Sequence, residues 1–381
     1  MNKKSQYFKL YYSFENALSV PLILNQIAQF LDKVNINQLT LCKRKIYKIY
    51  CNLVKKIKIE KEADTLNLKV LIDKYKNINN LDLSLCRNIK DFIPITKLKK
   101  LEILNVSEVD IYDISFLEKN KNIKELYLEK CENIIDFSPI SQLERLEILN
   151  ANKTHIYDIS FLEINKNIKE LYLENCNDII DFNPISKLDK LEKLNVSEVV
   201  INDISFLEKN KNIKELYLEN CEDIINFSPI SKLERLEILN ANKTHIDNIS
   251  FLEKNKNIKE LYLERCKFIT DFSPISKLER LENLNVNRTN FSDISILENN
   301  KSIKKLYLEN CFIIEDFTPI SKFEKLEVLY LSETEISDLS ILEKNKNIKE
   351  LILIFCQQIT DFSPISKLER LEILDFSDTN R

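Results

Sequence analysis

The apolar residues of the chain follow one pattern that returns many times after residue 78. In the stretch that begins at Ile123, two leucines alternate with a tyrosine, and the later apolar positions stand about three residues apart. Alternation predicts a short strand with one face turned inward, because successive side chains of a strand point to opposite faces. The wider spacing predicts a loop and a short helical turn. The apolar positions of this stretch are Ile123, Leu126, Leu128, Cys131, Ile134, Phe137, Ile140 and Leu143.

The pattern has a period of 45 residues, and each period divides into two similar halves of 23 and 22 residues. One half places a cysteine after the strand, and the other most often places a threonine there, as in Cys131 and Thr154. Both halves resemble the leucine-rich repeat, L-x-x-L-x-L-x-x-(C/T). We call them cysteine coils and threonine coils. Cysteine coils start at Ile78, Ile123, Ile168, Ile213, Ile258, Ile303 and Ile348; threonine coils start at Leu101, Leu146, Leu191, Leu236, Leu281 and Leu326.

A single coil of this kind cannot bury its own apolar edge, whereas stacked coils bury a continuous core. The sequence therefore predicts an α/β fold, namely a leucine-rich-repeat solenoid shaped as a curved horseshoe with a parallel sheet on its concave face. A small α-helical domain is expected before it. The array is expected to span residues 78–381, with 13 full coils and a terminal strand that begins at Leu371.

Polar residues predict how the chain turns between these elements. Ser138 is expected to cap a short helix whose first position is Pro139, where a missing N–H costs nothing. Asp113 and Ser115 are expected to do the same in a threonine coil. Asn122 is expected to take the left-handed conformation that glycine would hold, because asparagine tolerates it and the chain has no glycine.

The regular cysteines are predicted to be small buried hydrophobes. Strands of neighbouring coils lie about 4.8 Å apart, so cysteines on alternate coils are about 10 Å apart. A disulfide needs Cα atoms within about 7 Å, and a zinc site needs sulfurs about 2.3 Å from one ion. Neither can form along the row, and no C-x-x-C pair exists. Many free thiols also agree with a reducing compartment.

Composition excludes several classes of function. The net charge is −4 with the two signs interspersed, so no basic face for nucleic acid is expected. No apolar run approaches the roughly 20 residues of a membrane span, and residues 1–20 do not resemble a signal peptide. We therefore expect a soluble intracellular protein, cytoplasmic or nuclear. His155 and His245 are expected at the surface, and we expect no catalytic residue, cofactor or metal.

The residues between the inward leucines are expected to form one outward surface on the sheet. Tyrosines in the cysteine coils should alternate with residues of the threonine coils, which are asparagines in all but one case. Such surfaces bind proteins in solenoids, and tyrosine is favoured at interfaces. The alternative is recent duplication of a good strand-forming residue. The predicted binding residues are Tyr127, Tyr172, Tyr217, Tyr262, Tyr307, Tyr330, Glu129, Glu174, Glu219 and Glu264, with an extended, partly basic protein surface as partner.

Residues 1–77 do not fit the repeat. We expect an extension at 1–16, two or three amphipathic helices at 17–54, and a cap of the solenoid at 55–77, with Ile57 and Ile59 in a strand and a helix after Thr65. The central segment resembles an F-box: it has Val20-Pro21, an I-x-x-F-L-D run at 27–32, and a basic cluster after Leu41. The repeats agree with this family in part, since "CKFITDF" at 266–272 resembles the cysteine-containing repeats of F-box proteins. "ETEISDLSIL" at 333–342 resembles internalin repeats instead.

The F-box resemblance implies a substrate receptor of a ubiquitin ligase. The helical segment would dock on a Skp-type adaptor, and the concave face would hold the protein to be ubiquitinated. Two alternatives stay open: a helical cap alone, and a free-standing scaffold such as a regulatory subunit or an internalin-like module. The residues implied in adaptor contacts or the F-box core are Pro21, Leu22, Ile27, Leu31, Ile36, Leu39 and Cys42.

Overall fold

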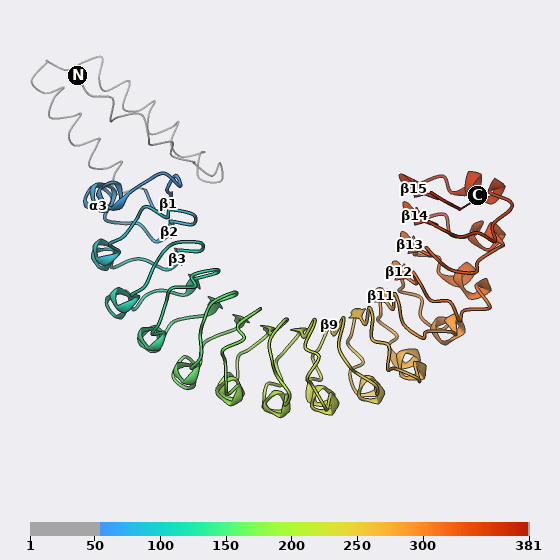
Figure 1. Ribbon diagram of the computed structural model, residues 1–381, viewed down its shortest axis with the longest axis horizontal. Coiled ribbons are helices and arrows are strands. Elements are labelled where there is room, and N and C mark those ends of the chain that lie inside the picture. Colours follow the sequence, from blue (N-terminus) through green and yellow to red (C-terminus); the bar gives the residue numbers. More distant parts are fainter. Residues whose placement is uncertain (1–53, 380–381) are drawn as a thin grey trace, which may run out of the picture. The chain divides into compact units, whose positions relative to one another are not determined.

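The computed structural model describes residues 54–379. This part of the chain divides between Ile156 and Tyr157 into two compact units, and each is described by itself. In both, every coil contributes a strand of three residues and, on the opposite side, a short helix, which is a 3₁₀ helix in all the repeat coils (Figure 1). The predicted F-box-like segment and the extension before it lie outside the described residues.

The first unit contains five parallel strands that pair in chain order, β1 to β5. A strand and a helix are present within 55–77; the strand contains Ile57 as predicted but ends at Lys58, before Ile59. Helix α3 begins after Asp64, whose side chain and that of Asn67 accept each other's backbone N–H in a capping box. The elements are β1 (Lys56–Lys58), α3 (Thr65–Lys74), β2 (Asn80–Asp82), η2 (Ile93–Lys97), β3 (Ile103–Asn105), η3 (Ser115–Lys119), β4 (Glu125–Tyr127), η4 (Ser138–Gln142) and β5 (Ile148–Asn150).

The second unit contains ten parallel strands, β6 to β15, again paired in chain order. The elements are η5 (Ser160–Glu163), β6 (Glu170–Tyr172), η6 (Asn183–Lys187), β7 (Lys193–Asn195), η7 (Ser205–Lys209), β8 (Glu215–Tyr217), η8 (Ser228–Lys232), β9 (Ile238–Asn240), η9 (Ser250–Glu253), β10 (Glu260–Tyr262), η10 (Ser273–Lys277), β11 (Asn283–Asn285), η11 (Ile294–Leu297), β12 (Lys305–Tyr307), η12 (Thr318–Lys322), β13 (Val328–Tyr330), η13 (Leu339–Leu342), β14 (Glu350–Ile352), η14 (Ser363–Lys367) and β15 (Ile373–Asp375).

The core of each unit is the stack of inward side chains that the alternation predicted. In β8, for example, Leu216 at the centre of the strand is fully buried, whereas Glu215 and Tyr217 on either side are half-buried. The next inward residue, Leu218, and the following cysteine, Cys221, are also fully buried. Burial of about 25 cal/mol per Å² of apolar surface stabilises such a stack, and it fixes which face of each strand points outward.

The turns before the 3₁₀ helices confirm the predicted cap at Asp113 but not the one at Ser138. Ser138 is the first residue of η4, and its backbone N–H and hydroxyl both donate to the carboxylate of Asp136, at 2.8 and 3.0 Å. The aspartate is therefore the acceptor, and the serine is a donor. Asp113 acts in the same way toward Ser115 in η3. The predicted cap Ser138 is therefore wrong. The acceptor is Asp136, two residues earlier, because its carboxylate reaches the first backbone N–H of the helix.

The left-handed residue also differs from the prediction. Positive φ occurs directly before the cysteine or threonine position, as at Lys130 with φ 56° and Asn220 with φ 60°. Asn122 is not in this conformation; its side-chain amide instead donates to the carbonyl of Lys99 at 2.8 Å. The turn that follows the strand thus needs a left-handed residue, and this chain fills that place without glycine.

A row of buried asparagines joins each threonine coil to the cysteine coil before it. Asn210 is 1% exposed, and its side-chain amide donates to the carbonyls of Ile185 at 2.9 Å and Leu188 at 3.1 Å. These carbonyls lie where η6 ends, so the amide satisfies acceptors that a short helix leaves unpaired. The members of this asparagine ladder with such bonds are Asn120, Asn210, Asn255, Asn300 and Asn345.

A row of ion pairs joins each cysteine coil to the threonine coil before it. From the coil that starts at Ile123 onward, the residue before each cysteine-coil strand is a lysine, and the equivalent residue of the preceding coil is a glutamate, as in Lys214 and Glu192 with 2.7 Å between Nζ and Oε2. The pairs in this ion-pair ladder are Lys124–Glu102, Lys214–Glu192, Lys259–Glu237, Lys304–Glu282 and Lys349–Glu327. Because these side chains are about 40% exposed, each pair contributes little to stability.

Candidate protein-binding face

The outward residues of the strands form one surface in each unit, which we call the strand face. In the second unit the register places tyrosines of the cysteine coils directly beside asparagines of the threonine coils: Tyr217 pairs with Asn195 on one side and Asn240 on the other. The alternation predicted from the sequence is therefore present. The tyrosine row of this unit comprises Tyr172, Tyr217, Tyr262, Tyr307 and Tyr330, and Tyr127 holds the same place in the first unit.

Four tyrosines, the one of the first unit and the first three of the second, donate their hydroxyls to a glutamate two residues earlier on the same strand. The Tyr172 hydroxyl lies 2.6 Å from Glu170 Oε2, and the Tyr217 hydroxyl lies 2.9 Å from Glu215 Oε2. Partial burial, followed by the neighbouring carboxylate, raises the pKa of Tyr217 well above its usual range. The phenol therefore stays a neutral donor, and the bond ties its hydroxyl to the same strand. Tyr127 and Tyr262 make the same bond to Glu125 and Glu260.

Lys193 lies between two rings of the tyrosine row. Its ammonium nitrogen is 5.6 Å from the centre of the Tyr172 ring and 5.4 Å from that of Tyr217, and it forms an ion pair with Glu215 at 2.7 Å. Both distances fall within the range of a cation–π contact. This arrangement shows that the tyrosine row already accommodates a lysine side chain between two of its rings. Lys193 was not among the predicted binding residues. From β3 onward, the equivalent positions of the other strands hold isoleucine, valine, glutamate or asparagine, apart from Lys305.

A second row of carboxylates follows the strands. Glu174 accepts from the amide of Asn195 at 3.2 Å, and Glu219 accepts from Asn240 at 3.2 Å and pairs with Lys243 at 2.7 Å. Burial raises the pKa of Glu309, the fourth member of the row. From β6 to β14, the outward strand positions and the positions two residues after them hold eight carboxylates and two lysines: Glu170, Glu174, Glu215, Glu219, Glu260, Glu264, Glu309 and Glu350, with Lys193 and Lys305. Two cations next to this set, Lys243 and Arg265, pair with Glu219 and Glu264. Glu129 holds the equivalent place in the first unit.

The tyrosine row changes character at its far end. The threonine coil that starts at Leu326 carries Tyr330 where the other threonine coils carry asparagine. The Tyr330 ring packs edge to face against the Tyr307 ring, with 4.9 Å between the ring centres. The Tyr330 hydroxyl donates to Glu350 on the next strand. The next outward positions, at the end of that strand and two residues beyond it, are apolar: Ile352 and Ile354. The strand face is therefore acidic and aromatic in its middle and more apolar at this end.

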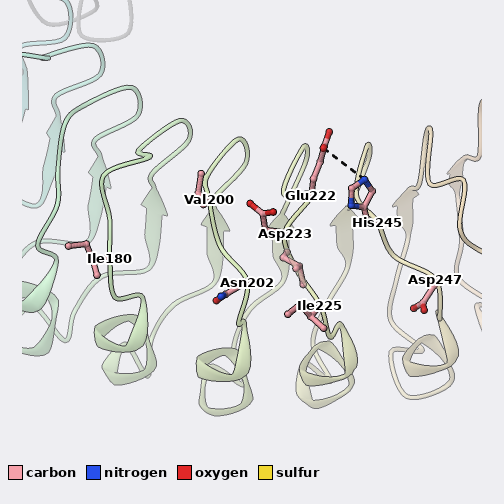
Figure 2. Close-up of a pocket in the computed structure, with 9 residues that line it drawn as sticks. Ile180, Val200, Asn202, Glu222, Asp223, Ile225, His245 and Asp247 are labelled. Atoms are coloured by element: carbon pink, nitrogen blue, oxygen red, sulfur yellow. Dashed lines mark ion pairs between the residues drawn. The ribbon is translucent and has the colours of Figure 1, made fainter.

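A hollow of about 700 Å³ lies away from the strand face, on the loops between strands and 3₁₀ helices of the second unit (Figure 2). We call this side the loop edge. His245 is exposed there, as predicted, with its Nε2 3.9 Å from Glu222 and its ring edge-on to Phe268. The hollow also contains Ile180 and Ile225, which are 87% and 84% exposed. Its lining thus combines exposed isoleucines with carboxylates and one histidine.

Comparison with known proteins agrees with the repeat pattern. A family model described as Leucine Rich repeats (2 copies) matches residues 324–367. An internalin of Listeria monocytogenes, InlF, is 26% identical over 74% of this chain and 83% of its own, with a TM-score of 0.66. An LRR protein of Leptospira interrogans is 19% identical over 88% of this chain and 93% of its own, with a TM-score of 0.69. The fold is a leucine-rich-repeat solenoid. No curated protein sequence matched the chain.

The cysteines of this leucine-rich-repeat chain lie where the sequence placed them. The seven described cysteines are fully buried free thiols, and Cys221 Sγ lies 3.0 Å from the carbonyl oxygen of Val196 in the preceding coil. InlJ of Listeria monocytogenes, described as including a cysteine ladder, is 20% identical over 74% of this chain and 64% of its own, with a TM-score of 0.57. The thiols here pack as small side chains and donate to carbonyls. Among residues 54–379 no group of His, Cys, Asp or Glu is placed to hold a metal ion.

These thiols are expected to be unreactive in the folded solenoid. Burial raises the pKa of Cys221 to about 11, and that of Cys131 likewise, so the thiolate that reacts with disulfide reagents is scarce at pH 8. Titration with Ellman's reagent at pH 8 should label at most Cys42 and Cys51, which lie outside the described residues, and all nine thiols in 6 M guanidinium. Glu222→Cys, at a 57% exposed side chain, should add one fast thiol. Rapid labelling of more than two wild-type thiols would contradict the packing.

The residues predicted to contact an adaptor, from Pro21 to Cys42, lie outside the described part of the chain. Within it, no helix has the length and apolar character needed to cross a membrane.

Proposed function

We propose that the protein is a non-catalytic interaction module whose strand face binds an extended, basic segment of a partner protein. The tyrosine row, flanked by carboxylates, carries this proposal. Tyrosine offers a large, rigid contact area with a polar end and is enriched at protein interfaces. The eight carboxylates outnumber the two lysines of the strands and the paired Lys243 and Arg265, so the surface is complementary to lysine and arginine. Solenoids of this class present such surfaces to protein partners.

The spacing of the row suits an extended peptide. Strands lie about 4.8 Å apart, so tyrosines on alternate strands are separated by about 10 Å. A peptide in the extended polyproline II conformation advances about 3.1 Å per residue and returns to the same face every third residue, so every third side chain, about 9.3 Å apart, would meet a tyrosine. Lys193 supports this because its ammonium already lies between Tyr172 and Tyr217 and pairs with Glu215. A partner's lysine would find the same surroundings between the next two tyrosines, where Ile238 replaces Lys193.

An intracellular location, cytoplasmic or nuclear, is part of this proposal. The seven buried cysteines support it, because they remain thiols in the structure and reducing compartments preserve thiols.

The proposal is tested with a random 12-residue peptide library displayed on phage and selected on the full-length protein. Selected peptides should be rich in lysine and arginine, and their affinity should fall as salt is added. The triple variant Glu174→Gln, Glu219→Gln, Glu264→Gln should bind them about tenfold more weakly, a loss of about 1.4 kcal/mol. The matched control removes three exposed glutamates from the 3₁₀ helices: Glu163→Gln, Glu208→Gln, Glu253→Gln. Equal loss in both variants, or neutral selected peptides, would reject the strand face as the site.

A second proposal concerns residues 17–54, whose sequence pattern supports adaptor binding of the F-box type. On this proposal the strand face holds a substrate for ubiquitination, and Pro21, Leu22, Ile27, Leu31, Ile36, Leu39 and Cys42 make the adaptor contacts or the helical core. The internalin similarity supports the rival, a free-standing interaction module.

A pull-down with a purified Skp-type adaptor separates the two. The full-length protein should capture the adaptor, and the variant Pro21→Ala, Leu31→Asp should not, while its far-ultraviolet circular dichroism stays unchanged. Failure of the wild type to capture the adaptor would leave the free-standing module.

A further inference from the structure

A second hollow on the loop edge of the second unit has an unusual lining. It encloses about 390 Å³ and is formed by three successive coils, those that start at Ile303, Leu326 and Ile348. Two phenylalanines and two glutamates form its sides. The full lining is Phe312, Glu333, Thr334, Glu335, Phe355, Gln357 and Gln358.

The two phenylalanines are not part of the buried core. Phe312 is 59% exposed and Phe355 is 48% exposed. Phe355 also takes the left-handed conformation, with φ 58°, which is an outlier for a bulky side chain. The other cysteine coils of this unit place polar residues at both positions. They are Asn175, Asn220, Arg265 and Asn310 at the place of Phe355, and Asn177, Glu222, Lys267 and Gln357 at the place of Phe312.

The two glutamates have no cationic partner within the described chain. Both are exposed, and no lysine, arginine or histidine nitrogen among residues 54–379 forms an ion pair with Glu333 or Glu335. Thr334 between them is buried, and its hydroxyl donates to the carbonyl of Leu331 at 2.6 Å. The hollow therefore presents two carboxylates and two aromatic rings, whereas the Thr334 hydroxyl is already hydrogen-bonded to Leu331.

We propose that this hollow binds a lysine side chain of a partner protein. The ammonium would meet the carboxylates of Glu333 and Glu335, and the apolar stem of the lysine would lie against the rings of Phe312 and Phe355. Aromatic rings attract cations through their faces, and a lysine combines a compact charge with a four-carbon apolar stem. The exposed and strained Phe355 gains a role on this proposal that folding does not supply. The site lies on the loop edge and does not depend on the strand face.

The test uses saturation-transfer NMR with the full-length protein and three small probes: the N-acetyl, N-methylamide derivatives of lysine, arginine and norleucine. Norleucine has the apolar stem without the charge. The lysine probe is expected to bind at least tenfold more tightly than the norleucine probe and more tightly than the arginine probe. Equal binding of norleucine would show that only apolar contact operates, and equal binding of arginine would remove the lysine preference. Either result would overturn the proposal.

Variants of the lining residues test whether the lysine probe binds in this hollow. Phe355→Asn, Phe312→Asn and the pair Glu333→Gln, Glu335→Gln should each weaken the lysine probe at least fivefold. Phe355→Asn introduces the residue that three equivalent coils carry, so its midpoint of thermal unfolding should not fall. The controls are Glu222→Gln, Asp223→Asn in the other hollow, and the strand-face triple variant; both should keep the lysine signal. Loss in the strand-face variant with retention in the phenylalanine variants would refute this site while supporting the strand face.

Discussion

Replacing Asn210 by aspartate is expected to destabilise the second unit by about 4 kcal/mol or more at pH 7. The side chain is 1% exposed, and its amide donates to two buried carbonyls, those of Ile185 and Leu188. Aspartate has the same size but no donor, so it leaves two acceptors unsatisfied, at about 1–3 kcal/mol each. It also directs a buried carboxylate at two carbonyl dipoles, and burying an unpaired charge costs more still. The free energy of unfolding in urea measures the effect.

The matched control for this variant is Asn212→Asp, two residues away. Its amide donates to the carbonyl of Asp189 at 2.6 Å in an exposed setting, where water can replace the bond. We expect a loss below about 1 kcal/mol there, in line with exposed hydrogen bonds. An equal loss in the two variants would contradict the role of the asparagine ladder.

The Asn210→Asp variant should also depend on pH in a defined direction. Burial should raise the pKa of the new carboxyl in the folded state above its unfolded value of about 3.9. Its protonated form is then the better tolerated one, so the penalty is smallest below about pH 4 and grows as pH rises through the folded pKa. The gap between the variant and the wild type should narrow when urea unfolding is repeated at pH 4.

Replacing Leu216 by alanine is expected to cost about 2–5 kcal/mol, as large-to-small changes in packed cores do. Leu216 is fully buried at the centre of β8 and lies beside Leu194 and Leu239 of the flanking strands. These neighbours are held by their own coils, so they cannot collapse into the cavity. Urea unfolding followed by circular dichroism measures the loss.

Tyr217→Ala is the control, because Tyr217 follows Leu216 on the same strand and points to the opposite face. Its ring is half-buried, and its hydroxyl bond to Glu215 is partly exposed. The cost should be less than half that of Leu216→Ala, whereas binding to the strand face should suffer more. A larger loss of stability at Tyr217 would mean that the tyrosine row belongs to the core.

The inward and outward faces of the strands could be predicted because a period of two leaves no freedom once one face must be buried. The turns could not be predicted as well. Asparagine at 122 suggested a left-handed residue, yet that conformation falls at positions such as Lys130 and Asn220, where residue type varies from coil to coil. In a chain without glycine, composition does not mark the left-handed positions. Asn122 instead uses its side chain as a donor.

The rows of the strand face were likewise predictable, but the contacts within them were not. The position of the Lys193 ammonium between the rings of Tyr172 and Tyr217 depends on side-chain conformations, which a repeat pattern does not specify. The same holds for the asparagine ladder. Most of its members were visible as the first letter of the "NKN" motif (Asn300 begins "NKS"), but their contact with carbonyls crosses between coils and depends on where the preceding 3₁₀ helix ends.

The two ladders have a consequence for how such a gene can grow or shrink. Asparagines join a cysteine coil to the next threonine coil, whereas lysine–glutamate pairs and cysteine–carbonyl bonds join a threonine coil to the next cysteine coil. Removing one coil, residues 213–235, would bring Glu192 beside Glu237 and put Thr244 where Cys221 was. Removing residues 213–257 would instead bring Lys259 to Glu192 and Cys266 to Val196, which recreates the lost junction. The heritable unit of duplication or deletion is thus the pair of coils.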